Sequence, residues 1–289
     1  IQYWEGTHDL GFMIGDSYGN ALKYLNNEDY KKVMVQAAKS LSSRFKPKAG
    51  IIQSWESNDR WQCPVIIDNM MNLEMLFEAT KISGDSTFYD IAVTHADTTM
   101  SKHFRKDYSS YHVLDYHTET GEVLKRNTAQ GYQDESAWAR GQAWGLYGFI
   151  IMYRETKNPK YLNHAKKIAG FIMNHPNLPK DKVPYWDYDA PVTAQTPRDA
   201  SAAAITASAL YELSTFVEGD LKLAYKNEAT TIVETLSKEP YLAKLGTNEG
   251  FLLKHSTGHL PDDSEIDVPI NYADYYFLEA LMRQREMVK

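Results

Sequence analysis

Asp68 is the residue whose surroundings in the sequence point most directly to chemistry. It follows the apolar run Val65-Ile66-Ile67, a pattern that predicts a carboxylate at the start of a buried helix. A second carboxylate, Asp9, stands where another helix of the same kind is expected to begin. Aspartate is also a favoured N-cap, because its side-chain oxygen accepts an unsatisfied backbone N–H. Taken alone, Asp68 therefore leaves a structural and a catalytic interpretation open.

The expected proximity of the two carboxylates has a chemical consequence. Two neighbouring carboxylates cannot both ionise freely, so one of them tends to hold a proton near neutral pH, as general acid catalysis requires. The N-terminus of a helix acts in the opposite direction and favours the ionised form. The sequence therefore predicts that one of Asp9 and Asp68 is a general acid, and this argument alone does not decide which of them it is.

Arg140 and Trp144 form a second candidate group, because they lie four residues apart on one face of an expected helix. Arginine binds carboxylates with a pair of parallel donors, and tryptophan offers a flat surface for stacking. Together they predict a place for a planar acidic ring. The alternative is a structural cation–π pair, although the neighbouring Gly141 and Gly145 leave that face thinly covered.

The histidines at the far end of the chain do not predict a metal site. His255 and His259 have the four-residue spacing of a zinc-binding pair, but Gly258 and Pro261 predict a loop there, and no glutamate follows His255. Serine and cysteine nucleophile motifs, phosphate-binding glycine loops and calcium loops are also missing from the sequence. We therefore expect neither a metal ion nor a cofactor.

Composition narrows the class of partner. Hydrophobic residues make up 43% of the 289-residue chain, enough for a sizeable core, and the net charge of −7 argues against nucleic acid and anionic membranes. No apolar stretch is long enough to span a membrane. The single cysteine, Cys63, excludes an internal disulfide framework and leaves a cytoplasmic and a periplasmic location equally open.

The elements that must position these residues are predominantly helices, with strand-like alternation confined to short pieces such as Tyr111-His112-Val113-Leu114. A repeat of about 60 residues alternates helices with polar faces and helices rich in small or apolar residues. The polar, outer helices open at Asp29-Tyr30, Phe88-Tyr89, Lys160-Tyr161 and Ala224-Tyr225. The inner helices start near Asp9, Asp68, Ser136, Asp199 and Asn271. Such hairpins predict a closed ring or an open solenoid, and we favour the ring, with long polar and aromatic loops gathered at one end.

Several long motifs carry a resemblance to a known family. They are Thr7-His8-Asp9-Leu10-Gly11-Phe12, Ile66-Ile67-Asp68-Asn69-Met70-Met71-Asn72, Gln130-Gly131-Tyr132, Trp138-Ala139-Arg140-Gly141-Gln142-Ala143-Trp144 and Ser264-Glu265-Ile266-Asp267-Val268-Pro269. In this order, and almost from end to end, the chain resembles the unsaturated glucuronyl hydrolases of glycoside hydrolase family 88.

The resemblance implies an all-α fold, an (α/α)6 barrel of helical hairpins in which the first hairpin is missing, so that residues 1–289 form a single, N-terminally incomplete catalytic domain. It implies that Asp68 is the catalytic acid/base and that Asp9 assists it. The residues implied to hold the sugar are Trp55, His112, Gln130, Arg140 and Trp144. The implied partner is a lyase-generated oligosaccharide, from which the enzyme releases the terminal unsaturated uronic acid by hydrating its C4=C5 double bond.

Three other functions remain as alternatives. An unsaturated rhamnogalacturonyl hydrolase would share the barrel and the chemistry but act on pectin fragments. A non-catalytic sugar-binding protein would bind such fragments without forming product. A structural helical-repeat scaffold would show no dependence on Asp68, and it gives no reason for carboxylates at two successive inner-helix starts.

Overall fold

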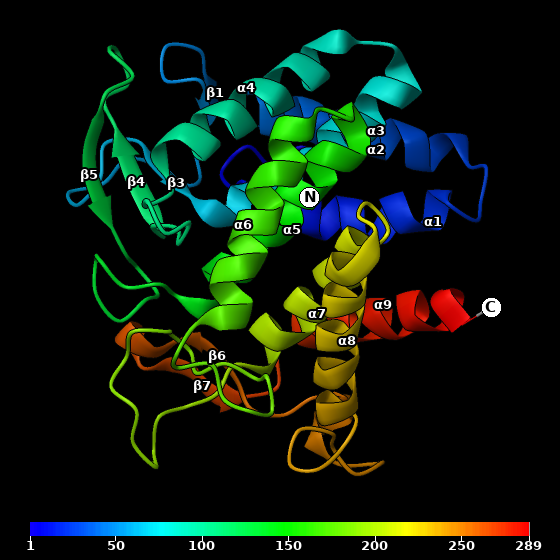
Figure 1. Cartoon of the computed structure of the whole chain (residues 1–289). Helices are drawn as coiled ribbons and strands as arrows, with labels where there is room; N and C mark the ends of the chain where they lie inside the picture. Colours follow the sequence, from blue (N-terminus) through cyan, green and yellow to red (C-terminus); the bar gives the residue numbers. More distant parts are fainter. Residues whose placement is uncertain (289) are drawn as a thin grey trace. The chain divides into compact units, whose positions relative to one another are not determined.

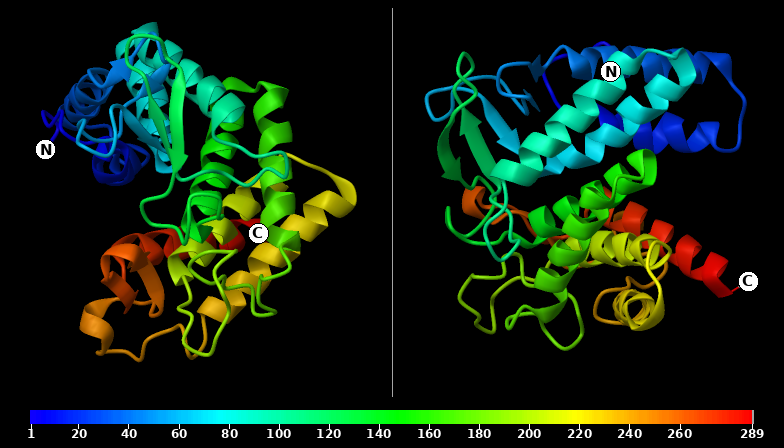
Figure 2. Two further views of the ribbon diagram at one scale, coloured as in Figure 1. Left: turned by 90° about the vertical axis from the view of Figure 1, so that its left-hand side faces the viewer. Right: turned by 45° about the horizontal axis from the view of Figure 1, so that its top comes forward.

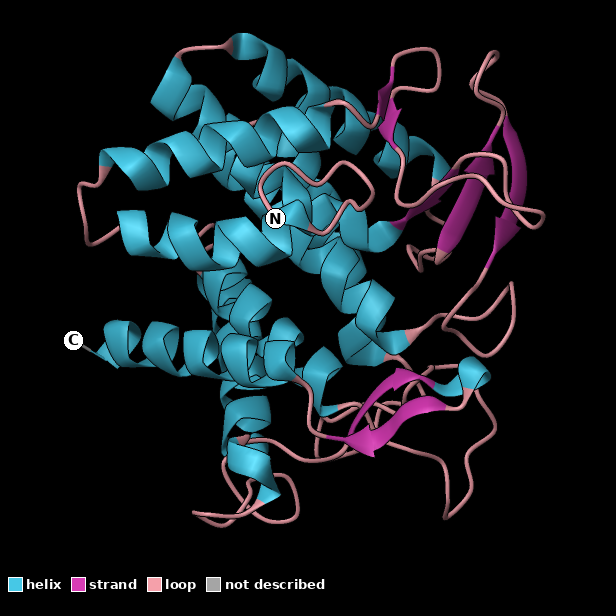
Figure 3. Cartoon of the chain, turned by 180° about the vertical axis from the view of Figure 1, so that it is seen from behind, coloured by secondary structure: helices cyan, strands magenta, loops and turns pink. Residues whose placement is uncertain are grey.

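The computed structural model describes residues 1–288 and is mainly helical, with a few short strands (Figures 1 and 3). The helices are η1 (Gly11–Gly19), α1 (Asn20–Leu22), α2 (Glu28–Ser42), η2 (Ile67–Asn72), α3 (Leu73–Ser83), α4 (Ser86–Lys102), α5 (Ala139–Thr156), α6 (Pro159–Asn174), α7 (Ala200–Ser214), α8 (Gly219–Leu236), η3 (Asn248–Gly250), η4 (Leu260–Asp262) and α9 (Asn271–Val288). The strands are β1 (Phe45–Lys46), β2 (Ile51–Ile52), β3 (Pro64–Ile66), β4 (Val113–Tyr116), β5 (Val123–Asn127), β6 (Ser256–His259) and β7 (Ser264–Val268).

The chain divides into two compact units. Unit 1 consists of Ile1–Phe104, Val113–Asn127 and Ile151–Tyr161. Unit 2 consists of Arg105–His112, Thr128–Ile150 and Leu162–Lys289. The division falls inside α5 and again inside α6, so each of these helices contributes residues to both units.

In unit 1, helices α2, α3 and α4 pack in sequence order, and α2 also packs against η1. The outer helix expected at Asp29-Tyr30 is α2, whose N-cap Asn27 accepts hydrogen bonds from the backbone amides of both residues. The outer helix expected at Phe88-Tyr89 is α4, capped by Asp85. The inner helix expected at Asp68 is formed by η2 and the buried helix α3 that continues it. The repeat of inner and outer helices is therefore confirmed here.

The first inner helix differs from its expected form. It is a π-helix, η1, and of its residues Gly11 and Ile14 are buried while the others keep part of their surface exposed. It packs against α2 and α3.

A small antiparallel sheet, β3-β4-β5, completes unit 1 (Figure 2). Pro64 pairs with Asp115 and Ile66 pairs with Val113, so the short strand expected around Val113 is confirmed. The Asp115 carboxylate also accepts the Cys63 amide at 2.7 Å. Because β3 leads directly into η2, this sheet fixes the point at which that helix begins.

In unit 2, α7 packs against α8 and α9 and is buried over its whole length. Its many alanines and serines allow this close packing, as expected for an inner helix. Its N-cap Asp199 accepts the backbone amides of Ser201 and Ala202. The outer helix α8 buries one side, which includes Tyr225 and Ile232.

The segment from His255 to His259 is not the loop expected from its glycine and the proline that follows. Ser256–His259 forms strand β6, which pairs with β7 in an antiparallel hairpin. Gly258 is suited to this strand, because a Cβ atom there would lie 2.1 Å from a carboxylate oxygen of Glu265. The glycine thus permits a tight hairpin where its sequence context predicted irregular structure.

Candidate active site

Asp68 lies in the first turn of η2 and is 9% exposed. The N-cap of this helix is Ile66, two residues earlier, and its side chain makes no capping hydrogen bond. The next residue, Asn69, donates to the carbonyl of Ile52 at 2.6 Å, and Ser54 Oγ accepts the amide of Ile66 at 3.0 Å. Asp68 is therefore placed by a strand before it and by a buried side-chain amide after it, as a rigid catalytic group requires.

Asp9 lies just before η1 and forms a pair with the preceding histidine. His8 Nε2 lies 3.2 Å from Asp9 Oδ1, while His8 Nδ1 lies 2.9 Å from the carbonyl oxygen of Ser54. A carbonyl oxygen can only accept, so Nδ1 carries the proton of that bond. Thr7 Oγ1 donates to the other oxygen of Asp9 at 3.1 Å. Thr7 therefore orients Asp9, while His8, a neighbour whose role the sequence did not reveal, is fixed beside it by the Ser54 carbonyl.

The start of η1 is in direct contact with Asn72, the last residue of η2. A Cβ atom on Gly11 would lie 2.5 Å from the Cα atom of Asn72, and the Phe12 amide donates to Asn72 Oδ1 at 3.2 Å. The absence of a side chain at position 11 thus lets the two helices approach closely. Asp9 and Asp68 stand within a few residues of this contact, so the structure places the two carboxylates at the starts of two contacting helices of unit 1, as the sequence predicted.

Trp55, the third predicted site residue of unit 1, is partly exposed. Its ring meets that of Trp61 edge to face at 5.3 Å between centroids. Its carbonyl accepts the Gln53 side-chain amide at 2.9 Å. A supported, partly exposed indole is a suitable surface for stacking a sugar ring.

In unit 2, His112 and Gln130 are brought together. His112 Nδ1 accepts the backbone amides of Ala129 and Gln130, each at 3.1 Å. The His112 ring lies against Trp138 at 4.4 Å between centroids. Because a backbone amide can only donate, Nδ1 must be unprotonated, and the proton of a neutral ring must be on Nε2. His112 is therefore oriented as a hydrogen-bond donor through Nε2.

Arg140, in the first turn of α5, is 2% exposed and bonded on several sides. One terminal nitrogen donates to Asp199 at 3.1 Å and to the Thr257 carbonyl at 2.6 Å, and the other donates to the Gly258 carbonyl at 2.7 Å. Its guanidinium also lies over the ring of Trp138 at 4.5 Å. Arg140 thus holds the N-cap residue of α7 and the β6 strand in addition to any ligand.

The Gly258 carbonyl links two of the predicted residues, because it also accepts the side-chain amide of Gln130 at 2.9 Å. Trp144 is 3% exposed and lies in an aromatic group, with its ring 6.0 Å from Tyr272 and 5.3 Å from Tyr276. Tyr272 also lies 5.3 Å from the Arg140 guanidinium. The predicted residues of unit 2 are therefore joined through β6 and α9.

Two further features concern metals and membranes. Within residues 1–288, no group of three or more histidine, cysteine, aspartate or glutamate side chains could hold a metal ion. None of the helices in the described part of the chain is long and apolar enough to cross a membrane.

Comparison with known proteins gives the family. Residues 11–287 match the model of Glycosyl Hydrolase Family 88. An unsaturated glucuronyl hydrolase of Formosa agariphila is 51% identical over 284 residues, which cover 98% of this chain and 70% of the relative. An unsaturated chondroitin disaccharide hydrolase of Streptococcus pyogenes serotype M1 is 35% identical, over 96% of this chain and 69% of the relative.

A solved structure gives the same result for the fold. The crystal structure of an unsaturated glucuronyl hydrolase specific for heparin superposes with a TM-score of 0.96 and 54% sequence identity, covering 99% of this chain and 76% of that one. The fold class predicted from sequence, an all-α fold of the (α/α)-barrel type, is confirmed by this likeness. The chain therefore belongs to glycoside hydrolase family 88 and is a glycoside hydrolase.

Proposed function

We propose that this enzyme releases the unsaturated uronic acid from the non-reducing end of oligosaccharides generated by polysaccharide lyases. The observation that carries the proposal is the pair of carboxylates, Asp9 and Asp68, at the starts of two helices, η1 and η2, that touch at Gly11 and Asn72. The relatives named above act on unsaturated glucuronyl and chondroitin disaccharide substrates, which favours this function over the hydrolysis of pectin fragments.

The proposed reaction is the hydration of a double bond. Asp68, in its protonated form, gives its proton to C4 of the C4=C5 bond, and positive charge develops at C5 and the ring oxygen. The resulting carboxylate then takes a proton from a water molecule, whose oxygen adds at C5. The proton taken from water restores the Asp68 acid. The hemiketal opens to a ketone at C5 and a hemiacetal at C1, and collapse of this hemiacetal to an aldehyde releases the neighbouring sugar as an alcohol. This differs from ordinary glycoside hydrolysis, in which two carboxylates flank the glycosidic carbon.

Asp9 has a supporting role in this proposal. One oxygen of its carboxylate accepts the Thr7 hydroxyl at 3.1 Å, and the other lies 3.2 Å from His8 Nε2, so the group is held in place beside these two residues. Its negative charge near the acid favours the protonated form of a neighbouring carboxyl group. We assign to Asp9 the tuning of the Asp68 proton affinity.

The sugar-binding residues are proposed for each unit by itself. In unit 1, Trp55 offers its partly exposed ring for stacking. In unit 2, His112 offers its Nε2–H to a hydroxyl or carboxylate oxygen, and Gln130, Arg140 and Trp144 shape the same region. Because Arg140 already bonds protein acceptors, its loss is expected to disturb the β6 hairpin as well as substrate affinity.

The test of this function uses the absorbance of the conjugated double bond. Lyase-made disaccharides from glycosaminoglycans should lose ultraviolet absorbance when the enzyme is added, and pectin-derived disaccharides should not. Asp68→Asn should lower kcat about 10²–10⁴-fold, the usual contribution of general acid–base catalysis, with little change in KM. The matched control is Asp90→Asn, an exposed aspartate of α4, which should leave both constants unchanged.

The other outcomes separate the alternatives. Full turnover by Asp68→Asn would assign the acid to a different group. Saturable binding of the disaccharides without product would indicate a sugar-binding protein. Turnover of unsaturated rhamnogalacturonan fragments in place of glycosaminoglycan disaccharides would identify the pectin-directed enzyme.

A further inference from the structure

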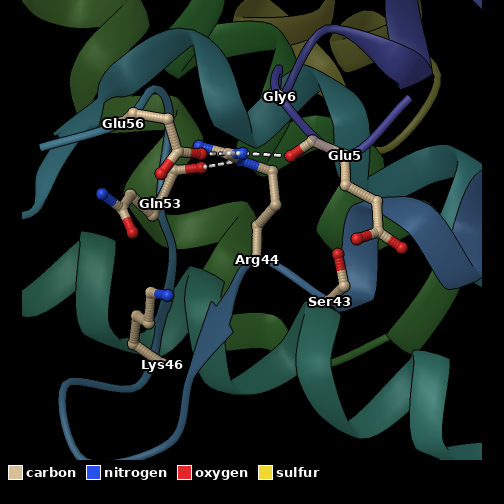
Figure 4. Close-up of a pocket in the computed structure, with 7 residues that line it drawn as sticks. All are labelled: Glu5, Gly6, Ser43, Arg44, Lys46, Gln53 and Glu56. Carbon is tan, nitrogen blue, oxygen red and sulfur yellow. Dashed lines mark hydrogen bonds and ion pairs between the residues drawn. The ribbon is translucent and has the colours of Figure 1, made fainter.

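A polar cavity of about 330 Å³ lies in unit 1 (Figure 4). Its volume is at the lower end of the range for small-molecule sites, and charged and polar side chains line it. The residues lining it are Glu5, Gly6, Ser43, Arg44, Lys46, Gln53 and Glu56. None of these residues belongs to the site proposed above.

Arg44 is 4% exposed and joins three segments around this cavity. Its Nε donates to the carbonyl of Gln53 at 2.7 Å, and its Nη1 donates to the Glu5 carbonyl and, at 2.8 Å, to the Glu56 carboxylate. Its second terminal nitrogen, Nη2, is buried and has no hydrogen-bond partner among the residues that the structure describes. Since a buried N–H without an acceptor is costly, this nitrogen has a donor to offer to a group bound in the cavity.

Lys46 adds a second donor on the wall of the same cavity. It is partly exposed, and its ammonium group forms no ion pair or hydrogen bond with residues 1–288. The nearby Lys48 differs, because it is bound to Glu119 at 2.6 Å. Two cationic side chains with unused donors thus line one small cavity.

The acidic residues of the cavity do not supply the missing acceptors. Glu56 is already paired with Arg44 through Nη1, and its side chain is 75% exposed. Figure 4 shows the Glu5 carboxylate directed away from the Arg44 guanidinium. The carboxylates of the cavity therefore leave the donors of Arg44 and Lys46 unused, and these cationic donors match an oxyanion such as a sulfate or carboxylate group.

The cavity shares its backbone with the candidate active site of unit 1. The segment of Glu5 and Gly6 runs directly into Asp9, and Gln53 is followed by Ser54. The Ser54 carbonyl lies 2.9 Å from His8 Nδ1, and its hydroxyl accepts the Ile66 amide at 3.0 Å, just before Asp68. The segment of Gln53 and Ser54 thus connects the wall of the cavity to both carboxylate-bearing segments.

We propose that this cavity is an oxyanion subsite, in which Lys46 and Arg44 bind an acidic substituent on the sugar that leaves during the reaction. The identity of the natural ligand, a substituent of the substrate, rests on the function proposed above. The preference for an oxyanion rests on the side chains that line the cavity in unit 1. A free sulfate or phosphate ion would satisfy the same donors, so the two sources are separated by experiment.

The first experiment tests the chemistry without turnover. Binding of inorganic sulfate to the wild-type protein, measured by calorimetry and by the rise in Tm, should be weakened about tenfold by Lys46→Met, the loss of one charge-assisted hydrogen bond. Lys48→Met, in the same hairpin but already paired, is the matched control and should bind sulfate as the wild type does. Glu56→Gln removes a negative charge from the rim and should tighten binding. No sulfate binding by the wild type, or equal binding by the wild type and Lys46→Met, would overturn the proposal.

The second experiment assigns the source of the oxyanion. Two unsaturated disaccharides are compared that differ by one sulfate group on the leaving sugar. Lys46→Met should raise KM about tenfold for the sulfated disaccharide and leave KM for the unsulfated one unchanged. An equal effect on both would refute a substrate subsite, and sulfate binding that does not compete with the sulfated disaccharide would assign the cavity to a free ion instead.

The two proposals fail in distinguishable ways. If neither disaccharide is turned over by the wild type, the proposed function is wrong, and the calorimetric result still decides the chemistry of the cavity. If both are turned over and Lys46→Met behaves as the wild type in both experiments, the function stands and the oxyanion subsite is wrong.

Discussion

At the scale of single residues, the backbone decides which proton His112 carries. Two amides, those of Ala129 and Gln130, point at Nδ1 from 3.1 Å each. A proton on Nδ1 would face two other donors and break both bonds. The arrangement therefore ties the loop that carries Gln130 to the neutral, Nε2-protonated form of the ring.

This tautomer can be observed directly. In protein labelled with ¹⁵N at its nine histidines, the His112 ring should show the shifts of an Nε2–H tautomer at pH 7, with assignment from a His112→Gln variant. A signal from an Nδ1–H or doubly protonated ring at that pH would contradict the assigned donor role.

The sequence is more informative about the candidate site residues themselves than about the residues that they contact. Asp68 and Asp9 were found because an apolar run and a helix start are local patterns. The partners of Arg140 were not, because Asp199 and Gly258 are 59 and 118 residues away and no local pattern links them. The expected pairing of Arg140 with Trp144 along one helix was a local prediction, and it could not anticipate contacts made through the β6 strand.

At the scale of elements, the contact between η1 and η2 depends on a single glycine. A side chain at Gly11 would meet the backbone of Asn72, which cannot move aside as a flexible side chain would. At Gly15, one turn later, a Cβ atom would lie 3.7 Å from Met75, an ordinary van der Waals distance. The two glycines therefore make a matched pair for substitution.

Gly11→Ala should destabilise the protein by about 1–3 kcal/mol, as overpacking usually does. It should also lower kcat, because η1 and η2, the helices that position the two carboxylates, would be pushed apart where Gly11 meets Asn72. Gly15→Ala should be neutral or stabilising by up to about 1 kcal/mol, because alanine favours helix over glycine. Urea unfolding and the absorbance assay measure both effects, and a Gly11→Ala variant with wild-type stability and kcat would show that the close approach is not required.

The positions of the helices can be predicted from the sequence more readily than the π-helical form of η1 or the β6–β7 hairpin. Apolar spacing and capping residues such as Asn27 and Asp199 are short-range signals, and the helices begin close to where these signals stand. The π-helical form of η1 and the pairing of β6 with β7 depend on packing and on contacts across the chain. Helix and strand propensities of the residues alone do not predict these two features, because tertiary contacts override the propensities.

At the scale of the whole molecule, each unit contains a buried histidine that should make stability sensitive to acid. Burial lowers the pKa of His95, in unit 1, to about 3, and that of His164, in unit 2, to about 4. The ordinary pKa of histidine is 6.5, so below that pH the unfolded chain binds protons that the folded chain excludes. The stabilisation from both residues is complete above about pH 6.5 and is lost as the pH falls toward 4.

The free energy of unfolding should therefore fall by about 1.4 kcal/mol per pH unit for each of these histidines between pH 6 and pH 4. His95→Gln keeps an acceptor for the Ile52 amide, which now bonds His95 Nδ1 at 3.0 Å, and should remove one of the two contributions. Urea denaturation at several pH values gives the slopes. Identical slopes for the variant and the wild type would show that His95 takes up its proton in the folded protein.

One feature of unit 1 bears on how this enzyme can vary. Ser54 meets the segment of Asp9 through its carbonyl and the segment of Asp68 through its hydroxyl. A substitution of Ser54 would alter the contacts of both segments. Its effect on stability and activity should therefore not be additive with the effects of substitutions at His8 or Asn69. In evolutionary terms such positions form an epistatic group, in which a change survives when its neighbours change with it. A mutational library of this enzyme would therefore need to vary these positions together to find active combinations.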